Sequence, residues 1–97
     1  MFTSKQRSNL RSLAQNIAPV TQVGKGGISE NLIKSLSDAL DARELIKISV
    51  LNNAESDARE IAEELAAALN AETVEVIGKK VVLYRKSARK DIKHIKF

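Results

Sequence analysis

The stretch that decides the fold reads Val20-Thr21-Gln22-Val23-Gly24-Lys25-Gly26-Gly27-Ile28-Ser29. Residues 20–23 have the β-branched composition of a short strand, and Ser29 is a typical N-cap for a helix that follows. Between them, three glycines and a lysine connect the end of the strand to the start of the helix. A strand followed by a tight connection and a helix is typical of an α/β domain.

The glycine segment at residues 24–27 can be a simple turn or a phosphate site. Glycine adopts positive φ angles at no steric cost, so the segment could serve only to turn the chain. Backbone N–H groups at a helix N-terminus also attract anions, and missing Cβ atoms let a phosphate approach closely. Lys25 adds a full positive charge. The residues alone leave both interpretations open.

Three known glycine motifs differ from this segment. A Walker loop requires G-x-x-x-x-G-K-[ST], which this chain lacks, so NTP hydrolysis is not expected. The dinucleotide fingerprint G-x-G-x-x-G fails at Ser29, and the chain is too short for a doubly wound fold. The GXXG loop of a KH domain matches as a string, but it joins two helices rather than a strand and a helix.

Upstream of this stretch, the sequence predicts a helix. Thr3 or Ser4 can act as its N-cap, and Pro19 stops it because proline disfavours a helical conformation in the preceding residue. Its buried face is expected to hold Leu10, Leu13, Ala14 and Ile17, which have the three- and four-residue spacing of one helix face.

Downstream, apolar periodicity and turn residues predict the remaining elements. They are a helix from Ser29 to about Ala42, a strand over 45–51, a helix from near Ser56 to near Asn70, and strands over 73–77 and 81–85. Gly78 is expected to supply a positive φ between the last two strands. The order α-β-α-β-α-β-β predicts an α/β domain of two or three layers, with a partly parallel sheet that ends in an antiparallel hairpin. We expect one domain over residues 1–86 and a basic tail over 87–97.

Composition excludes several classes of protein. The chain has 97 residues and no cysteine, which excludes a disulfide framework, thiolate metal sites and cysteine nucleophiles. We expect a cytoplasmic protein without a membrane segment, secretory signal, metal or cofactor. The lone histidine, His94, is expected to be a solvated tail residue. Little chemistry remains for an enzyme.

The net charge of +4 hides an uneven distribution. Residues 1–28 hold four bases and no acid, residues 29–78 hold four bases and eleven acids, and residues 79–97 hold eight bases and one acid. Both ends of the chain are therefore positive and the middle is negative, which favours a polyanionic partner for the ends.

Short motifs at characteristic spacing identify a family resemblance. They are Ser4-Lys5-Gln6-Arg7, Leu10-Arg11-x-Leu13-Ala14, Pro19-Val20, Gly24-Lys25-Gly26-Gly27, Glu44-Leu45-Ile46-Lys47, Val76-Ile77-Gly78-Lys79 and Leu83-Tyr84-Arg85. Together they resemble the YhbY-type family, single-domain bacterial proteins built on the CRM (chloroplast RNA splicing and ribosome maturation) domain. The resemblance implies three helices and a four-stranded mixed sheet, like the C-terminal domain of bacterial initiation factor three. It also implies RNA binding, which in bacteria concerns precursors of the large ribosomal subunit and in plants intron splicing.

The expected RNA-binding residues follow from the resemblance and from charge. The family's GxxG loop maps onto Gly24, Lys25, Gly26 and Gly27. The bases expected around it are Lys5, Arg7 and Arg11 of the first helix, and Lys79, Lys80, Arg85 and Lys86 at the hairpin and after it. Each group could instead be a solvated surface, and the tail could be flexible. Whether the two basic groups converge is left open by the sequence.

Two functional hypotheses follow. The first is a noncatalytic RNA-binding protein that binds structured ribosomal RNA in a pre-ribosomal particle and assists assembly of the large (50S) subunit. The alternative is a protein-interaction module that recruits a basic assembly factor or ribosomal protein through Glu60, Glu63 and Glu64. With only three aromatic residues, a base-stacking platform is not expected, and Tyr84 is predicted to pack in the core.

Overall fold

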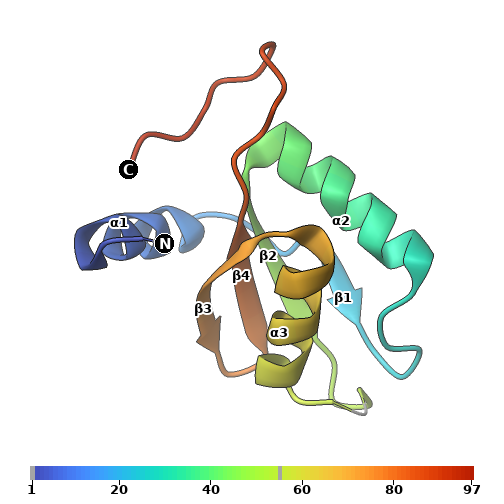
Figure 1. The fold of residues 1–97 in the computed structure, drawn as a ribbon. Coiled ribbons are helices and arrows are strands. Elements are labelled where there is room, and N and C mark those ends of the chain that lie inside the picture. Colours follow the sequence, from blue (N-terminus) through green and yellow to red (C-terminus); the bar gives the residue numbers. More distant parts are fainter. Residues whose placement is uncertain (1, 55) are drawn as a thin grey trace.

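The computed structural model describes residues 2–54 and 56–97, which form three layers (Figure 1). Helix α1 (Ser4–Ala14) covers one face of a sheet, and α2 (Glu30–Arg43) and α3 (Ala58–Leu69) cover the other face. The strands are β1 (Thr21–Val23), β2 (Leu45–Val50), β3 (Glu72–Ile77) and β4 (Lys80–Tyr84). The α/β class and the element order are therefore confirmed.

The sheet is mixed, with strand order β1-β2-β4-β3. β1 pairs with β2 in parallel, so that Val23 lies opposite Val50. β4 is antiparallel to both β2 and β3. The last strand of the chain therefore lies inside the sheet, between β2 and β3.

Side-chain caps define the start of each helix. At α1 the Thr3 hydroxyl accepts from the Gln6 amide at 3.1 Å, and the Gln6 side chain accepts from the Thr3 amide at 3.0 Å. At α2 the hydroxyl of Ser29 accepts from the amide of Leu32, as expected for its N-cap. α3 begins after Asp57, which forms a capping box with Glu60. Each cap fixes the residue at which a loop ends and a helix begins, and it therefore sets the position of that helix N-terminus.

Two separate hydrophobic clusters hold the layers together. The larger lies between the sheet and α2 and α3, and includes Ile46, Ile48 and Val50 from one face of β2. The smaller lies between the sheet and α1. It consists of Leu10, Ala14, Leu45, Val74, Val82 and Tyr84. The prediction that Tyr84 packs in the core is confirmed.

The first helix differs from the prediction at its C-terminal end. α1 ends at Ala14, well before Pro19. Only Leu10 and Ala14 are buried, whereas Leu13 is 43% exposed and Ile17 is half-buried. Adjacent helical residues are rotated by about 100°, so Leu13 points sideways from the stripe that faces the sheet. The expected burial of Leu13 was wrong for this reason.

Candidate functional site

The glycine loop, residues 24–27, lies at the carboxyl end of β1 and leads into α2 (Figure 1). The amide of Gly27 donates to the carbonyl of Gly24 at 2.9 Å, which closes a turn around Lys25 and Gly26. Gly27 has φ +66°, a left-handed conformation that favours glycine. A Cβ on Gly24 would lie 3.1 Å from Leu51 Cδ1, so this glycine permits close packing. Two of the glycines therefore have local structural reasons to be present.

Lys25 and Gly26 face the solvent. A Cβ on Gly26 would meet nothing within 4 Å, and Lys25 is exposed. Beneath the loop is a hollow of about 200 Å³, one of whose walls is formed by Glu64. Because the Glu64 carboxylate repels anions, the surface around Lys25 is a better place for a phosphate than the hollow itself.

Two more lysines lie at the same end of the sheet. The amide of Leu51 donates to the carbonyl of Val23, and the amide of Val50 donates to that of Lys79. The glycine loop, the turn after β2 and the β3–β4 hairpin therefore meet at one sheet end. Lys79 is exposed, and Lys80 Nζ donates to Ser49 Oγ at 2.7 Å. We call Lys25, Lys79 and Lys80 the loop-end cluster.

Arg7 does not join the loop-end cluster. Its Nη1 donates to the carbonyls of Thr73 and Val74, at 2.7 and 2.9 Å, at the other end of the sheet. The guanidinium also lies 5.6 Å from the centre of the Phe2 ring. Arg7 therefore fastens α1 to the start of β3.

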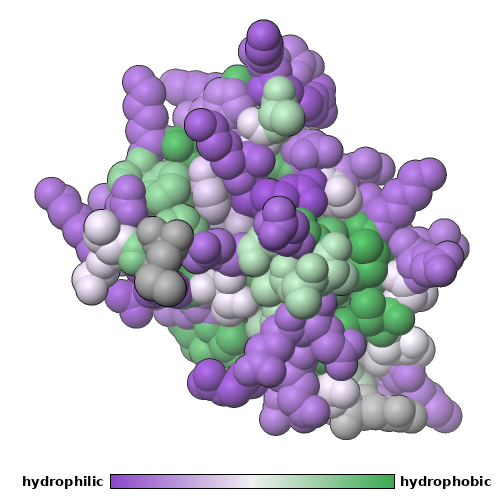
Figure 2. All heavy atoms as spheres, in the orientation of Figure 1, coloured by the Kyte–Doolittle hydropathy of each residue, from purple (hydrophilic) through white to green (hydrophobic). Residues whose placement is uncertain are grey.

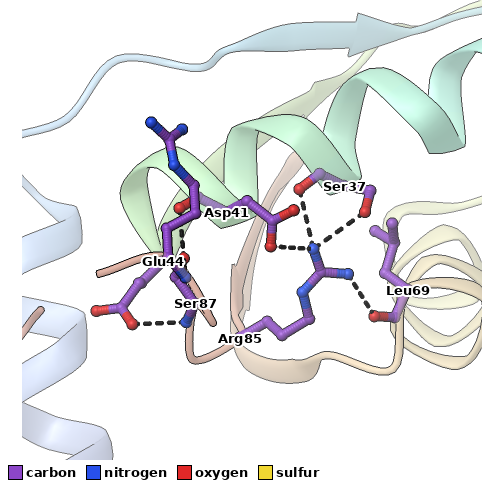
Figure 3. A network of polar contacts seen from close by, with 7 residues as sticks. Ser37, Asp41, Glu44, Leu69, Arg85 and Ser87 are labelled. Atoms are coloured by element: carbon purple, nitrogen blue, oxygen red, sulfur yellow. Dashed lines mark hydrogen bonds and ion pairs between the residues drawn. The ribbon is translucent and has the colours of Figure 1, made fainter. Parts of the chain in front are cut away.

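Arg85 is likewise turned inward (Figure 3). Its Nη1 donates to the Leu69 carbonyl at 2.9 Å, and its Nη2 contacts the carbonyl and hydroxyl of Ser37 and the carboxylate of Asp41. Since these acceptors belong to α2 and the end of α3, the guanidinium joins both helices to the strand β4. The planar fork of arginine suits this bridging role.

The remaining predicted bases, Lys5, Arg11 and Lys86, are exposed. Lys5 and Arg11 lie on α1, and Lys86 follows β4. The two ends of the chain come together beside α1, because Phe2 and Phe97 make an edge contact at 5.5 Å between ring centres. The structure thus divides the predicted site into the loop-end cluster and a second group of bases near the chain ends.

The sequence interpretation missed Glu44, the residue that fastens the tail. Glu44 is fully buried and has φ +65°. Its Oε2 accepts from the Ser87 amide at 2.7 Å and contacts His94 Nδ1 at 2.8 Å, and its Oε1 accepts from the Ile95 amide at 2.8 Å. Burial by itself would raise the pKa of Glu44, but the bonds from His94, Ser87 and Ile95 together outweigh it and lower the pKa from its ordinary value. An acid placed directly before a buried strand was the available signal.

His94 is exposed, as expected of a solvated tail residue, but it is also bound to the domain. Its side chain is 41% exposed, yet the ring contacts a carboxylate that is 1% exposed. The contact exists because the tail folds back over the C-terminal end of α2, where Glu44 lies.

The acidic residues of α3 lie on the other side of the sheet from α1. Glu60 takes part in the cap of its own helix, whereas Glu63 and Glu64 are exposed. Hydrophilic side chains cover most of the face seen in Figure 2, and hydrophobic ones form small patches between them. This face suits a polar or charged ligand better than an apolar one.

Neither a metal cluster nor a membrane helix occurs in the described part of the chain. Over residues 2–54 and 56–97, no three His, Cys, Asp or Glu side chains are grouped so that they could hold a metal ion. Within those same two ranges, no helix is long and apolar enough to cross a membrane.

Comparisons with known proteins show the family to which the chain belongs. The family model of the CRS1/YhbY (CRM) domain matches residues 2–85. The chain is 48% identical over 87 residues to "Probable RNA-binding protein YqeI" of Bacillus subtilis, covering 90% of this chain and 91% of the relative. It is 31% identical to "Probable RNA-binding protein PA4753" of Pseudomonas aeruginosa, covering 91% of this chain and 85% of the relative. The solution structure of the hypothetical protein SAV1595 from Staphylococcus aureus matches with a TM-score of 0.77 and 51% identity, over 98% of this chain and all of that one.

Proposed function

Because the chain belongs to the CRS1/YhbY (CRM) domain family, we propose that it is a noncatalytic RNA-binding protein that binds structured ribosomal RNA and assists assembly of the large ribosomal subunit. The relatives at 48% and 31% identity carry RNA-binding names, which supports the class of ligand. The family resemblance supports the large-subunit target. The observation that carries the proposal is the exposed glycine loop with Lys25 at the N-terminus of α2.

The loop would hold the RNA by its phosphates. Backbone N–H groups at the start of α2 carry partial positive charge, and Lys25, in the loop that leads into α2, adds a full charge. Lys79 and Lys80 extend the positive surface along the same sheet end. Phosphate contacts position a protein on RNA but carry no sequence information.

Base stacking contributes little in this proposal. All three aromatic residues, Phe2, Tyr84 and Phe97, pack against one another, with ring centres 4.9–5.5 Å apart. Since none of these rings is left as an open platform, recognition relies on the backbone and the shape of a folded RNA.

The loop is tested by measuring RNA affinity with fluorescence anisotropy on a folded fragment of large-subunit ribosomal RNA. We expect Lys25→Ala to weaken binding about fivefold or more and to reduce the slope of log affinity against log salt by about 0.7–0.9. Lys34→Ala removes an exposed lysine from the second turn of α2 and leaves the loop itself unchanged, and it is the control. Equal affinities for both variants would remove Lys25 from the interface.

Gly26 gives a second test of the same loop. Its surroundings are open and its φ is not positive, so Gly26→Val should leave the fold intact. The added side chain would keep a phosphate away from the loop backbone, and affinity should fall. Unchanged affinity would contradict close backbone contact.

The cellular role is tested by sedimentation of ribosomal particles and by crosslinking in cells followed by sequencing of the attached RNA. The proposal predicts accumulation of large-subunit precursors when the gene is deleted, and crosslinks to large-subunit RNA. Reversing the charges of Glu63 and Glu64 distinguishes the alternative, a protein contact through α3. Loss of ribosome association with unchanged RNA affinity would favour that alternative.

A further inference from the structure

The C-terminal segment, residues 86–97, lies beyond the matched family region of residues 2–85. It has no helix or strand, yet it runs back along the domain and ends near α1 (Figure 1). A segment without regular structure keeps a fixed path only where specific contacts hold it. Two such anchors are present.

The first anchor is the buried carboxylate of Glu44. It receives the amides of Ser87 and Ile95 and the ring of His94, so it holds both the beginning and the far part of the segment. Ser87 is 4% exposed, and its hydroxyl donates to the Asp41 carbonyl at 2.6 Å. The chain between residues 87 and 95 is therefore tied at both ends to the C-terminal end of α2.

The second anchor is aromatic. Phe97 makes edge contacts with Tyr84 at 4.9 Å and with Phe2 at 5.5 Å between ring centres. Ile95 also packs against the cluster beneath α1. The apolar residues of the segment thus face the domain, which directs its charged residues outward.

Most of the outward residues are cations. Lys86, Lys90, Lys93 and Lys96 are exposed, and Lys90, Lys93 and Lys96 recur at every third position. Arg89 and Asp91 form a two-pronged ion pair at 3.0 and 2.6 Å, so they neutralise each other. The neighbouring α1 adds Lys5 and Arg11 and contains no acid.

Glu44 and Asp41, two acids near the segment, do not cancel this charge. Glu44 is buried and bound by the segment itself, and Asp41 is paired with Arg85 at 3.0 Å. The exposed lysines of the segment consequently keep their positive charge, as do the exposed Lys5 and Arg11 of α1, near which the segment ends. Double-stranded nucleic acids carry one phosphate charge per ~1.7 Å of axis, the densest anionic partner available to a row of lysines.

We propose that residues 86–97, held by Glu44 and Phe97, form with α1 a second RNA-phosphate-binding surface that acts together with the loop-end cluster. The inference rests on the proposed function for its ligand, and it adds a segment, residues 86–97, that lies outside the matched family region. The loop-end cluster and this surface lie toward opposite ends of the sheet, in a domain whose longest dimension is 35 Å. A folded RNA is large enough to reach both.

The charge of the segment is tested by replacing Lys90, Lys93 and Lys96 together with serine. We expect affinity for the folded ribosomal RNA fragment to fall about tenfold or more, and the salt slope to fall by about 0.7–0.9 for each phosphate that the variant no longer neutralises. The control replaces Lys34 on α2 and Arg59 on α3, two exposed bases outside the segment and α1, with serine, and the two variants are compared per charge removed. Equal reductions in affinity for both variants would overturn the proposal, because they would indicate a general effect of net charge.

The fixed path of the segment is tested by Glu44→Gln. This change makes the protein more positive by one charge, so a flexible tail that only attracts RNA would bind equally well or better. A tail that must be held in position would bind RNA more weakly. The glutamine side chain has one acceptor oxygen, whereas the donors from Ser87, His94 and Ile95 use both oxygens of Glu44. Hydrogen exchange at the Ile95 amide reports directly whether the segment is released, and thermal unfolding checks that the domain remains folded. Weaker binding with faster exchange at Ile95 is the expected result.

The outcomes separate this inference from the proposed function. If Lys25→Ala weakens RNA binding while the triple lysine variant does not, the proposed function stands and the second surface is wrong. If the unaltered protein does not bind the RNA at all, the proposed function itself fails. If the triple variant keeps its RNA affinity but no longer retains an acidic ribosomal protein in pull-down from purified particles, the surface binds protein and the proposal is overturned.

Discussion

Glu44 and Arg85 at one end of the sheet differ from Lys25 and Lys79 at the other end in how their charged groups are bonded. At the end that carries Glu44, the charged groups of Glu44 and Arg85 are taken up by several bonds each within the domain. At the loop end, Lys25 and Lys79 are exposed and their side chains bond to none of the residues that the structure describes. Saturated charges hold the architecture together, whereas unsaturated ones are available to a ligand. The sequence presents both kinds as similar charged residues.

The largest expected effect comes from breaking the saturated end at Glu44. Glu44→Ala leaves several donors without their buried acceptor, and the free energy of unfolding should fall by about 3 kcal/mol. For a domain of this size the thermal midpoint should fall by about 15 °C. Urea and thermal unfolding followed by circular dichroism measure both quantities. Glu63→Ala, which removes an exposed carboxylate from α3, should change stability by less than about 0.5 kcal/mol.

Arg85 gives the next largest effect. Arg85→Lys keeps the charge but cannot reach acceptors on α2 and α3 at once, and we expect a decrease of about 2 kcal/mol in the free energy of unfolding. Arg11→Lys on the exposed side of α1 is the control and should be nearly neutral. If Arg85→Lys proved as harmless as the control in urea unfolding, the bridging role would be refuted.

The stability of the fold should also depend on pH through the carboxylate of Glu44. The folded-state pKa of Glu44 lies below its ordinary value of 4.5, so ionised Glu44 stabilises the fold at pH values above 4.5. This stabilisation disappears as the pH falls below 4.5 and through the lowered pKa. The stability difference between the unaltered protein and Glu44→Gln should therefore shrink on acidification over that range. A difference that stays constant from neutral pH to about pH 3 would contradict the role of the charge.

The smallest effect on stability is expected at the loop end. Removing both lysines in the double variant Lys25→Ala/Lys79→Ala should change the free energy of unfolding by less than about 0.5 kcal/mol, because neither side chain bonds to the described residues. RNA affinity of the same variant should fall about tenfold or more. A clear decrease in the stability of this double variant would contradict the conclusion that the loop-end lysines, unlike Glu44 and Arg85, do not hold the fold together.

The helices and strands were predictable because their signals are local. Ser29 caps α2, Gly78 has φ +54°, and Ile46, Ile48 and Val50 alternate on the buried face of β2. The strand order was not predictable, since a hairpin can add to a sheet through either of its strands. Only the register of β4 against β2 resolves that choice.

The division of the basic residues was also hidden from the sequence. Arginines on a helix face have the same sequence spacing whether they are solvated or bonded within the fold. The Arg7 guanidinium donates to two carbonyls of the distant strand β3, and its spacing on the helix does not indicate this. The role of Glu44 was hidden because its partners lie more than forty residues away, in a segment that has no periodic pattern. The position of Glu44 directly before a buried strand points to the residue itself, but no local pattern identifies its distant partners.

The position of β4 between β2 and β3 has a consequence for how the chain is made. During synthesis the central strand emerges after all the other strands, so the sheet cannot close while the polypeptide is still short. Until β4 is made, the edges of β2 and β3 that will pair with it carry backbone N–H and C=O groups without hydrogen-bond partners. Because these pairings join distant parts of the chain, folding should be slower than for a helical bundle of the same length. A chain that ends before Lys80 should therefore remain unfolded, and the sheet forms only after β4 has been synthesised.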